Sequence, residues 1–253
     1  MAEPDLVADC VRAMREVVKV PVTVKHRIGL DRDESYDFVA RFVDRVAQAG
    51  CKVFIVHARN AWLQGLSPKE NREVPPLRYE TVYRLKRDFP SLTIVINGGL
   101  RSHEDALKQL DHVDGVMLGR AACDDPWLLA RVDSRFYGAV DPIDDRLQVL
   151  EAIRPFLAQQ VVEGVSARAV LRHVMGLFNG LPGARAWRRT LSDSALLAQY
   201  GAVRSIRRSL ECFARRREWQ EKRSPRDQLR WCQAAHLVPG HWRLVPTLPS
   251  DRS

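Results

Sequence analysis

The chain has 253 residues, a formal net charge of +9 at pH 7 and a pI near 9.7. Its hydrophobic content of 45% excludes disorder throughout and is enough for one large domain, or for a medium domain with an appendage. The positive charge favours a polyanionic partner such as a nucleic acid. No apolar stretch is long enough to cross a bilayer and the first residues do not resemble a signal peptide, so we expect a cytoplasmic protein without membrane association.

Cysteine and histidine are spaced in ways that do not suggest metal binding. The five cysteines show no CxxC spacing, which argues against a disulfide framework and a zinc site and favours reduced thiols. The seven histidines show no HxxxH or HxH spacing and have no acidic cluster beside them. The sequence therefore predicts no metal site.

Short apolar strands alternate with amphipathic helices in the first half of the chain. We predict strands that start near residues 22, 53, 93 and 116. Helices are predicted over residues 5–17, 35–49, 79–89, 102–110 and 126–136, with Ser102 as an N-cap and Pro126 at a first helical position. Each strand is followed by a helix, and this alternation predicts a parallel sheet with right-handed crossovers.

The strand pattern ends after Gly138. Residues 143–162, 167–178 and 191–213 all have helical periodicity, which predicts a small all-helical domain. Beyond residue 218 the chain is polar and contains several prolines, so we expect a loosely ordered tail there.

Two glycine turns follow the third and fourth predicted strands. One is Asn97–Gly99 and the other is Gly119–Arg120. Successive turns of this kind, at the carboxyl ends of parallel strands, are where (β/α)₈ barrels commonly bind a phosphate through backbone N–H groups. Taken singly, either turn is explained equally well by chain geometry alone.

Polar side chains stand at the ends of the first two predicted strands. They are Lys25 and His26 on one strand and His57 on the next. Adjacent strand residues face opposite sides, so only one of Lys25 and His26 can face a barrel interior, and for His26 we favour a hydrogen-bonded structural role. Lys25, His57 and the glycine turns together predict a site for a large anionic cofactor. In it, Arg120 would bind phosphate and Lys25 would stabilise negative charge on a reduced flavin ring.

Two further segments carry basic residues. The connection 59–76 has no apolar periodicity, and connections of this length are usually functional or disordered. In the helical part, three arginines flank an aromatic residue, and another arginine lies one helix earlier; these residues are Arg185, Trp187, Arg188, Arg189 and Arg172. Charge interleaved with an aromatic suits RNA backbone contacts and base stacking, whereas a solvated helix face is the alternative. We interpret the second basic run, residues 204–217, as a solvated helix face.

Five segments together resemble the tRNA-dihydrouridine synthases, specifically the DusA branch. The segments are Pro21–Gly29 (PVTVKHRIG), Val56–Arg59 (VHAR), Gly65–Arg72 (GLSPKENR), Asn97–Gly99 (NGG) and Gly119–Ala121 (GRA). The GLSPKENR-like segment is highly specific, whereas the glycine turns are shared with many flavin barrels. The similarity is dense from residue 1 to about residue 210.

The resemblance implies an FMN-containing (β/α)₈ barrel followed by a helical tRNA-binding domain. Its reaction would be reduction of the C5=C6 bond of uridines in the tRNA D-loop, with NADPH reducing the flavin. The residues implied to contact FMN are Lys25, His57, Asn97, Gly98, Gly99, Gly119 and Arg120. Those implied to contact tRNA are Lys69, Arg72, Arg185 and Arg188. The implied domains are a partial flavin-binding barrel over 1–138, a tRNA-binding domain over 139–217 and the tail over 218–253.

One feature of the family is missing from these 253 residues. The family's proton-donating cysteine lies in an Asn-x-x-Cys-Pro-like motif, and no such motif is present. We do not expect Cys10 to replace it, because Cys10 falls on the apolar face of a predicted helix. With only four predicted strands, we expect an α/β fold that is the C-terminal half of a TIM-type barrel followed by the helical domain.

A half barrel without the family's cysteine leads to a functional expectation. We expect this C-terminal fragment to bind FMN weakly and to have no reductase activity of its own, with no catalytic residue assigned. The alternatives are a tRNA-binding remnant that acts without chemistry and another phosphate-binding flavin barrel oxidoreductase.

Overall fold

The computed structural model describes residues 1–31, 33, 35–193 and 195, and the chain divides into two compact units. The first unit is Met1–Pro142 and the second begins at Ile143.

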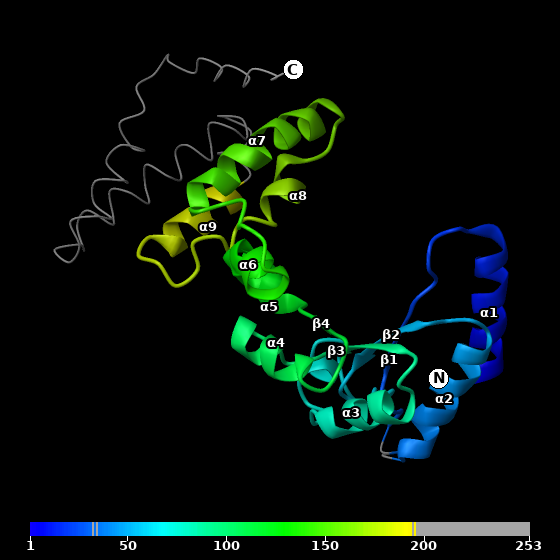
Figure 1. The fold of residues 1–253 in the computed structure, drawn as a ribbon. Coiled ribbons are helices and arrows are strands. Elements are labelled where there is room, and N and C mark those ends of the chain that lie inside the picture. The colour runs from blue at the N-terminus through cyan, green and yellow to red at the C-terminus, as the bar shows by residue number, and fades with distance from the viewer. Residues whose placement is uncertain (32, 34, 194, 196–253) are drawn as a thin grey trace, which may run out of the picture. The chain divides into compact units, whose positions relative to one another are not determined.

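A four-stranded parallel sheet with the strand order β1-β2-β3-β4 organises the first unit (Figure 1). The strands are β1 (Val24–Arg27), β2 (Val53–His57), β3 (Thr93–Asn97) and β4 (Gly115–Met117). The four predicted strands and their parallel pairing are confirmed. The register aligns Arg27 with His57, His57 with Asn97, and Asn97 with Met117, so all four strands end at one edge of the sheet.

The helices that alternate with these strands also match the prediction. They are α1 (Pro4–Val17), α2 (Tyr36–Gln48), α3 (Tyr79–Asp88) and α4 (His103–Leu110). The predicted cap of α4 is present, because the Ser102 hydroxyl accepts a hydrogen bond from the Asp105 N–H at 3.0 Å. The first unit is therefore an α/β structure.

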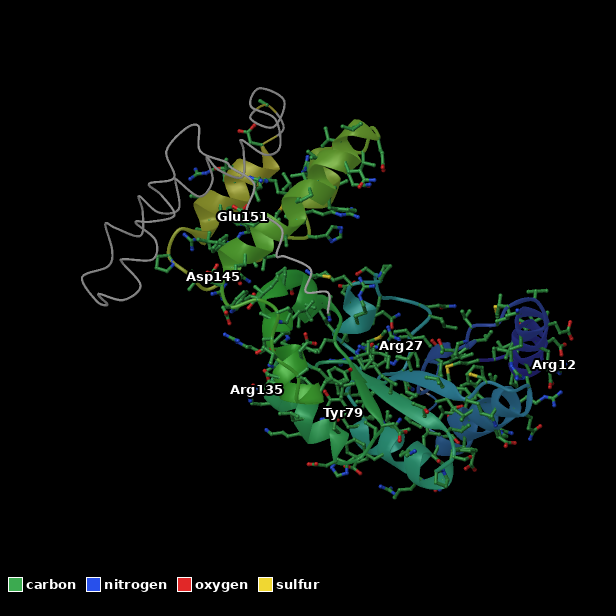
Figure 2. All side chains as sticks on the ribbon, turned by 45° about the horizontal axis from the view of Figure 1, so that its top comes forward. Arg12, Arg27, Tyr79, Arg135, Asp145 and Glu151 are labelled. Atoms are coloured by element: carbon green, nitrogen blue, oxygen red, sulfur yellow. The ribbon has the colours of Figure 1, made fainter. Side chains whose placement is uncertain are left out.

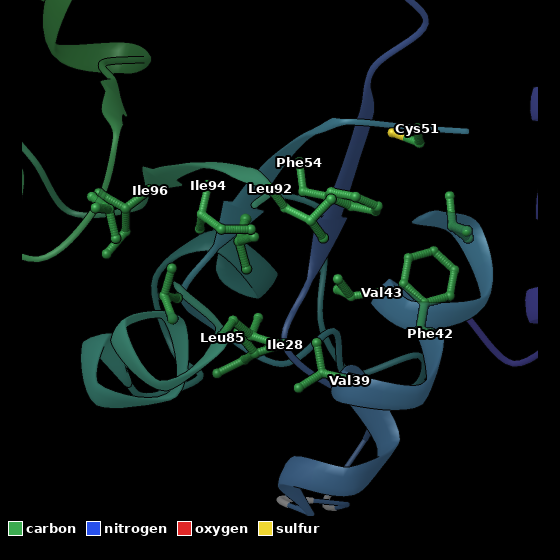
Figure 3. Close-up of a cluster of buried hydrophobic side chains, with 14 of the residues drawn as sticks. Ile28, Val39, Phe42, Val43, Cys51, Phe54, Leu85, Leu92, Ile94 and Ile96 are labelled. Carbon is green, nitrogen blue, oxygen red and sulfur yellow. The ribbon is translucent and has the colours of Figure 1, made fainter. Parts of the chain in front are cut away.

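The hydrophobic core lies between one face of the sheet and the helices (Figure 3). Phe54 and Val56 of β2 and Ile94 and Ile96 of β3 are fully buried on this face. Their alternation with partly buried neighbours follows from the period of two along a strand. The apolar stripes of α2 and α3 pack against them, with Phe42 and Leu85 among the buried members.

Helix α1 packs against α2 with part of its apolar surface. Ala8 and Val11 are buried, and the Arg15 guanidinium donates a hydrogen bond to the Ala49 carbonyl at 3.1 Å. Cys10 is exposed, because α2 covers only the side of α1 that carries Ala8 and Val11. Cys10 lies in line with the apolar residues Leu6 and Met14, four positions to either side, so it is on the apolar face as expected, but this part of the face is exposed.

The segment after β4 is more broken than predicted. In place of one helix over 126–136, the structure has α5 (Arg120–Asp124), the 3₁₀ helix η2 (Pro126–Arg131) and α6 (Val132–Tyr137). Asp125 separates the first two, since its carboxylate accepts a hydrogen bond from the Trp127 N–H at 3.2 Å and caps η2.

The boundary between the two units lies after Pro142, whereas the sequence predicted it after Gly138. Asp141 explains the difference. Its carboxylate accepts hydrogen bonds from the Ser134 N–H at 3.0 Å and the Ser134 hydroxyl at 2.7 Å, and pairs with Arg131 at 3.0 Å. These contacts hold residues 139–142 on the first unit.

The described part of the second unit contains the helices α7 (Arg146–Val162), α8 (Ala167–Leu171) and α9 (Ala184–Ser192). Helix α8 ends at Leu171, so the prediction of a helix to residue 178 is wrong. The Val174 carbonyl accepts a hydrogen bond from the Trp187 indole at 3.1 Å, and the Leu177 carbonyl accepts one from Arg146 at 2.7 Å. The backbone after Leu171 forms i→i−3 hydrogen bonds in place of α-helical ones, such as the Leu177 N–H to the Val174 carbonyl at 3.0 Å.

Helix α9 was not predicted, although Ala184, Trp187 and Leu191 have helical spacing and are buried. The predicted helix over 191–213 overlaps α9 at its start and otherwise lies outside the described residues, apart from positions 193 and 195. The basic run 204–217, the end of the predicted domain 139–217 and the tail 218–253 also lie outside them.

His26 belongs to the core. Its ring lies edge-on to Phe42 and Phe54, with centroid distances of 5.1 and 5.9 Å. Nδ1 donates a hydrogen bond to the Arg27 carbonyl at 2.6 Å, while Nε2 is buried without a hydrogen-bond partner. The structural role predicted for His26 is confirmed, and burial lowers its pKa to about 4.

Replacing His26 by leucine is expected to reduce the loss of stability on acidification. The unfolded chain protonates His26 near pH 6.5 and the folded chain only near pH 4, so the free energy of unfolding falls as the pH drops through this window. The share of His26 has an upper limit of about 1.4 kcal/mol per pH unit. Urea unfolding near pH 7 and near pH 5 should therefore differ less in His26→Leu than in the unchanged chain. An unchanged difference would contradict the assignment, and His112→Gln, at an exposed histidine of the same unit, is the control.

Candidate cofactor and nucleic-acid site

A row of polar side chains follows the edge where the strands end, on the face of the sheet opposite the core. Lys25 and Arg27 of β1, His57 of β2 and Asn97 of β3 share this face, because each is offset by an odd number of positions from the buried residues of its strand. Lys25 is exposed and Arg27 is half-buried. The predicted residues Lys25, His57 and Asn97 are thus brought together, and Arg27 joins them.

Positive charge dominates the surroundings of His57. Burial and then the charges of four cationic residues lower the pKa of His57 to about 3; the four are Arg27, Lys25, Arg59 and Arg120. Burial and the neighbouring Arg27 also lower the pKa of Lys25. His57 is therefore neutral at physiological pH, and the charge around it favours an anionic ligand.

The turn Asn97–Gly99 is constrained by the protein itself. Gly98 and Gly99 have φ values of +117° and +74°, a region that side-chain-bearing residues rarely adopt. A Cβ on Gly98 would lie 2.8 Å from the His57 ring, and one on Gly99 would lie 2.6 Å from Leu77. The Tyr79 hydroxyl donates a hydrogen bond to the Gly98 carbonyl at 2.7 Å. Chain geometry alone thus requires both glycines.

The turn Gly119–Arg120 has a different character. Gly119 has a φ of −123°, and a Cβ there would meet no atom within 4 Å. Protein packing therefore does not require glycine at this position. Arg120 is exposed, pairs with Glu73 and adds to the positive charge at His57.

Several residues at the strand ends suit a phosphate-bearing flavin. Open space at Gly119 admits a ligand close to the backbone, and Arg120 beside it can pair with phosphate. Lys25 and the neutral His57 can contact an anionic ring system. The residues present fit the group.

The connection between β2 and α3 is an ordered loop, which carries Lys69 and Arg72 at its exposed surface. It contains the 3₁₀ helix η1 (Glu70–Arg72). The Glu70 carboxylate accepts hydrogen bonds from the Ser67 hydroxyl at 2.6 Å and the Ser67 N–H at 2.8 Å. Of the two alternatives that the sequence left open for this segment, disorder is therefore excluded.

Arg27, Arg59 and Asn71 received no role in the sequence analysis. Arg27 donates hydrogen bonds to the Asn71 carbonyl at 2.9 Å and to the Asn60 carbonyl at 2.9 Å, while Arg59 donates to the Pro75 carbonyl. Figure 2 shows Arg27 beside the sheet, above Tyr79. The period of two, which puts Arg27 on the Lys25 face, is the one signal that could have identified Arg27.

Arg185 and Arg188 belong to the second unit, on α9. Arg185 is exposed, and Arg188 donates a hydrogen bond to the Asn179 amide oxygen at 2.8 Å. Trp187 between them is fully buried, lies edge-on to Phe178 at 4.8 Å and donates to the Val174 carbonyl. The prediction that Trp187 stacks on bases is wrong, because the indole is part of the core of this unit.

Among the described residues, no group of three or more metal-binding side chains is present. No helix in the same part of the chain is long and apolar enough to cross a membrane.

Comparison with known families identifies the chain. Residues 1–215 match the family described as dihydrouridine synthase (Dus). The chain belongs to the dihydrouridine synthase family. It is 54% identical over 201 residues to a Synechocystis sp. protein named tRNA-dihydrouridine(20/20a) synthase. It is 55% identical over 195 residues to a Shewanella oneidensis protein with the same name.

The alignments cover more of this chain than of the relatives. They include 79% and 77% of the chain, against 60% and 58% of the Synechocystis and Shewanella proteins. The chain thus spans about three fifths of the length of these relatives.

Solved structures are much less similar. A mandelate oxidase variant aligns with 92% of the chain and 72% of its own length, at 16% identity and a TM-score of 0.32. Dihydrodipicolinate synthase from Oceanobacillus iheyensis aligns with 91% of the chain and 78% of its own length, at 11% identity and a TM-score of 0.32. The closed barrel stays a prediction.

Replacement of Gly98 by alanine is expected to destabilise the first unit by about 2–4 kcal/mol, because it combines a strained φ with a clash against His57. Gly65→Ala separates the two effects, since Gly65 has a φ of +81° and open space around it. It should cost only about 1 kcal/mol. Urea unfolding of both variants measures the difference, and equal costs would show that the His57 contact contributes nothing.

Proposed function

We propose that this chain carries the flavin-binding and RNA-contacting part of a tRNA-dihydrouridine synthase. The reaction is reduction of the C5=C6 bond of D-loop uridines in tRNA, with FMN as cofactor and NADPH as reductant. The uridines are those at positions 20 and 20a, the numbers in the names of the relatives. The observation that carries the proposal is the cationic row at the sheet edge, in a member of the dihydrouridine synthase family. A tRNA substrate implies a location in the cytoplasm.

The strand-end residues would hold the cofactor. Lys25 and His57 would contact the flavin ring, and the turns Asn97–Gly99 and Gly119–Arg120 would hold the ribityl chain and the phosphate. When bound, the flavin supplies the hydride that reduces the uridine. Lys25 contributes positive charge beside the ring, and His57, neutral at physiological pH, contributes hydrogen bonds without adding charge.

Four cations outside the row would bind the RNA. Lys69 and Arg72 project from the ordered loop next to the row, while Arg185 and Arg188 lie on α9. Contacts of this kind neutralise phosphates and make affinity depend on salt. The target base must also leave the stacked RNA to reach a flavin.

Two other functions remain to be compared with this one. One is a remnant that binds tRNA without chemistry. Another flavin oxidoreductase is disfavoured by the Lys69 and Arg72 loop, because an enzyme for small molecules has no need of it.

Charge reversal at the RNA surface tests the proposal directly. Arg72→Glu and Arg188→Glu are each expected to weaken tRNA binding about tenfold or more near 0.1 M salt and to flatten its salt dependence by about one unit of slope. Fluorescence anisotropy with labelled tRNA over a salt series measures both quantities.

Arg12→Glu is the matched control for these variants. It makes the same change in net charge on α1, away from Arg27 and the loop beside it (Figure 2). If Arg12→Glu weakened tRNA binding as much as Arg72→Glu and Arg188→Glu do, the effect of those two variants would come from overall charge alone. Unchanged affinity in Arg72→Glu or Arg188→Glu would remove the RNA role of that residue.

The purified chain is expected to bind FMN weakly and to form no dihydrouridine from tRNA and NADPH. Flavin fluorescence titration and mass analysis of the tRNA nucleosides are the two measurements. Riboflavin, which lacks the phosphate, should bind more weakly than FMN, and Arg120→Gln should remove most of that difference. Equal binding of FMN and riboflavin would contradict the phosphate assignment, and dihydrouridine formation would contradict the inactivity.

A further inference from the structure

The loop between β2 and α3 is attached to the end of β1 by one side chain. The Arg27 guanidinium nitrogen Nη1 donates hydrogen bonds to the carbonyls of Asn60 and Asn71, both at 2.9 Å. These carbonyls lie near the two ends of the segment that projects from the sheet edge. Arg27 thus closes the segment 60–71 into a ring fixed to the sheet.

A second set of contacts closes the same ring from within. The Asn71 amide oxygen accepts a hydrogen bond from the Trp62 N–H at 3.1 Å, and its amide nitrogen donates to the Trp62 carbonyl. The Asn71 N–H donates to the Ser67 carbonyl at 2.9 Å. The side chain of Asn71 therefore pairs with the Trp62 backbone as a neighbouring strand would.

The base of the ring is joined to the loop after β1. Leu30 and Ala61 form a parallel bridge, and the Ala61 N–H donates to the Gly29 carbonyl at 2.9 Å. The Asn60 side chain, which is 5% exposed, donates to the Asp33 carbonyl at 2.7 Å. The ring therefore stands on buried, hydrogen-bonded backbone.

The cations Lys69 and Arg72 flank the residue that both sets of contacts hold. Their backbones are joined by a hydrogen bond from the Arg72 N–H to the Lys69 carbonyl at 3.0 Å. Both side chains are exposed, while Asn71 is half-buried. The contacts of Asn71 thus fix the backbone from which both cations project.

We propose that Arg27 and Asn71 are positioning residues for RNA binding, which hold Lys69 and Arg72 in a preformed arrangement beside the Lys25–His57 row. This inference rests on the proposed function. A loop fixed before binding loses less conformational entropy when the RNA arrives, and its cations face the phosphates at a set spacing. Asn71 fixes the loop through hydrogen bonds alone, without carrying a charge and without contacting the RNA.

Asn71→Ala is the informative variant, because it removes both Trp62 contacts and leaves the net charge unchanged. It is expected to weaken tRNA binding about tenfold near 0.1 M salt and to lower the salt slope, since Lys69 and Arg72 no longer meet phosphates together. In the Lys69→Ala/Arg72→Ala background, Asn71→Ala should cause no further loss, because the cations through which it acts are absent.

Gln109→Ala is the matched control for a general loss of stability. Gln109 is a buried amide on α4 of the same unit that accepts a hydrogen bond from the Tyr83 hydroxyl at 2.8 Å. Its replacement should lower the free energy of unfolding and leave tRNA affinity and the salt slope unchanged. If Asn71→Ala weakened tRNA binding only by destabilising the fold, Gln109→Ala would weaken tRNA binding in the same way.

The outcomes separate this inference from the function on which it rests. Equal weakening by Asn71→Ala in both backgrounds, or no weakening in the unchanged background, would overturn the positioning role and leave the RNA role of the cations intact. No weakening by Lys69→Ala/Arg72→Ala would instead overturn the RNA role of the loop, and the positioning role with it. Absence of tRNA binding by the unchanged chain would overturn the proposed function itself.

Discussion

The alternation of side chains along β1, combined with the parallel register, is the constraint on which the first unit depends. It sends His26 into the core between Phe42 and Phe54, while Lys25 and Arg27 face the other side. Because all four strands end in register, the polar residues of neighbouring strands form one row. A shift of one residue in β1 would bury the two cations and expose the histidine.

The row formed by Lys25, Arg27, His57 and Asn97 places positive charge beside a buried histidine, where partial exclusion of water strengthens electrostatic interactions. His57 responds with a strongly lowered pKa, so it contributes hydrogen-bonding capacity and no charge of its own. Arg27 has two effects at once, because it adds to this field and holds the loop that presents Lys69 and Arg72. Cofactor and RNA contacts would therefore share a single structural support.

In the second unit, one helix carries both core residues and exposed residues. On α9, Trp187 and Leu191 form the core with Phe178, while Arg185 and Arg189 are exposed. In the proposed RNA binding, Trp187 would contribute only by fixing the helix that carries the arginines. A cationic sequence with an aromatic in its middle is thus an ambiguous signal, since helical periodicity can turn the two kinds of residue to opposite sides.

Local sequence patterns were enough to predict the order of strands and helices in the first unit, the glycine turns after β3 and β4, and the membership of the family. These features depend on local periodicity, on capping residues such as Ser102, and on motifs such as GLSPKENR, all of which are short-range properties of a chain. The tertiary structure alone decided the roles of Arg27 and Asn71, the early end of α8, the burial of Trp187 and the pKa of His57. Each of these depends on partners distant in sequence, as when Arg27 reaches the Asn71 carbonyl across 44 positions. Only folding brings such groups together, and no local pattern encodes which of them will meet.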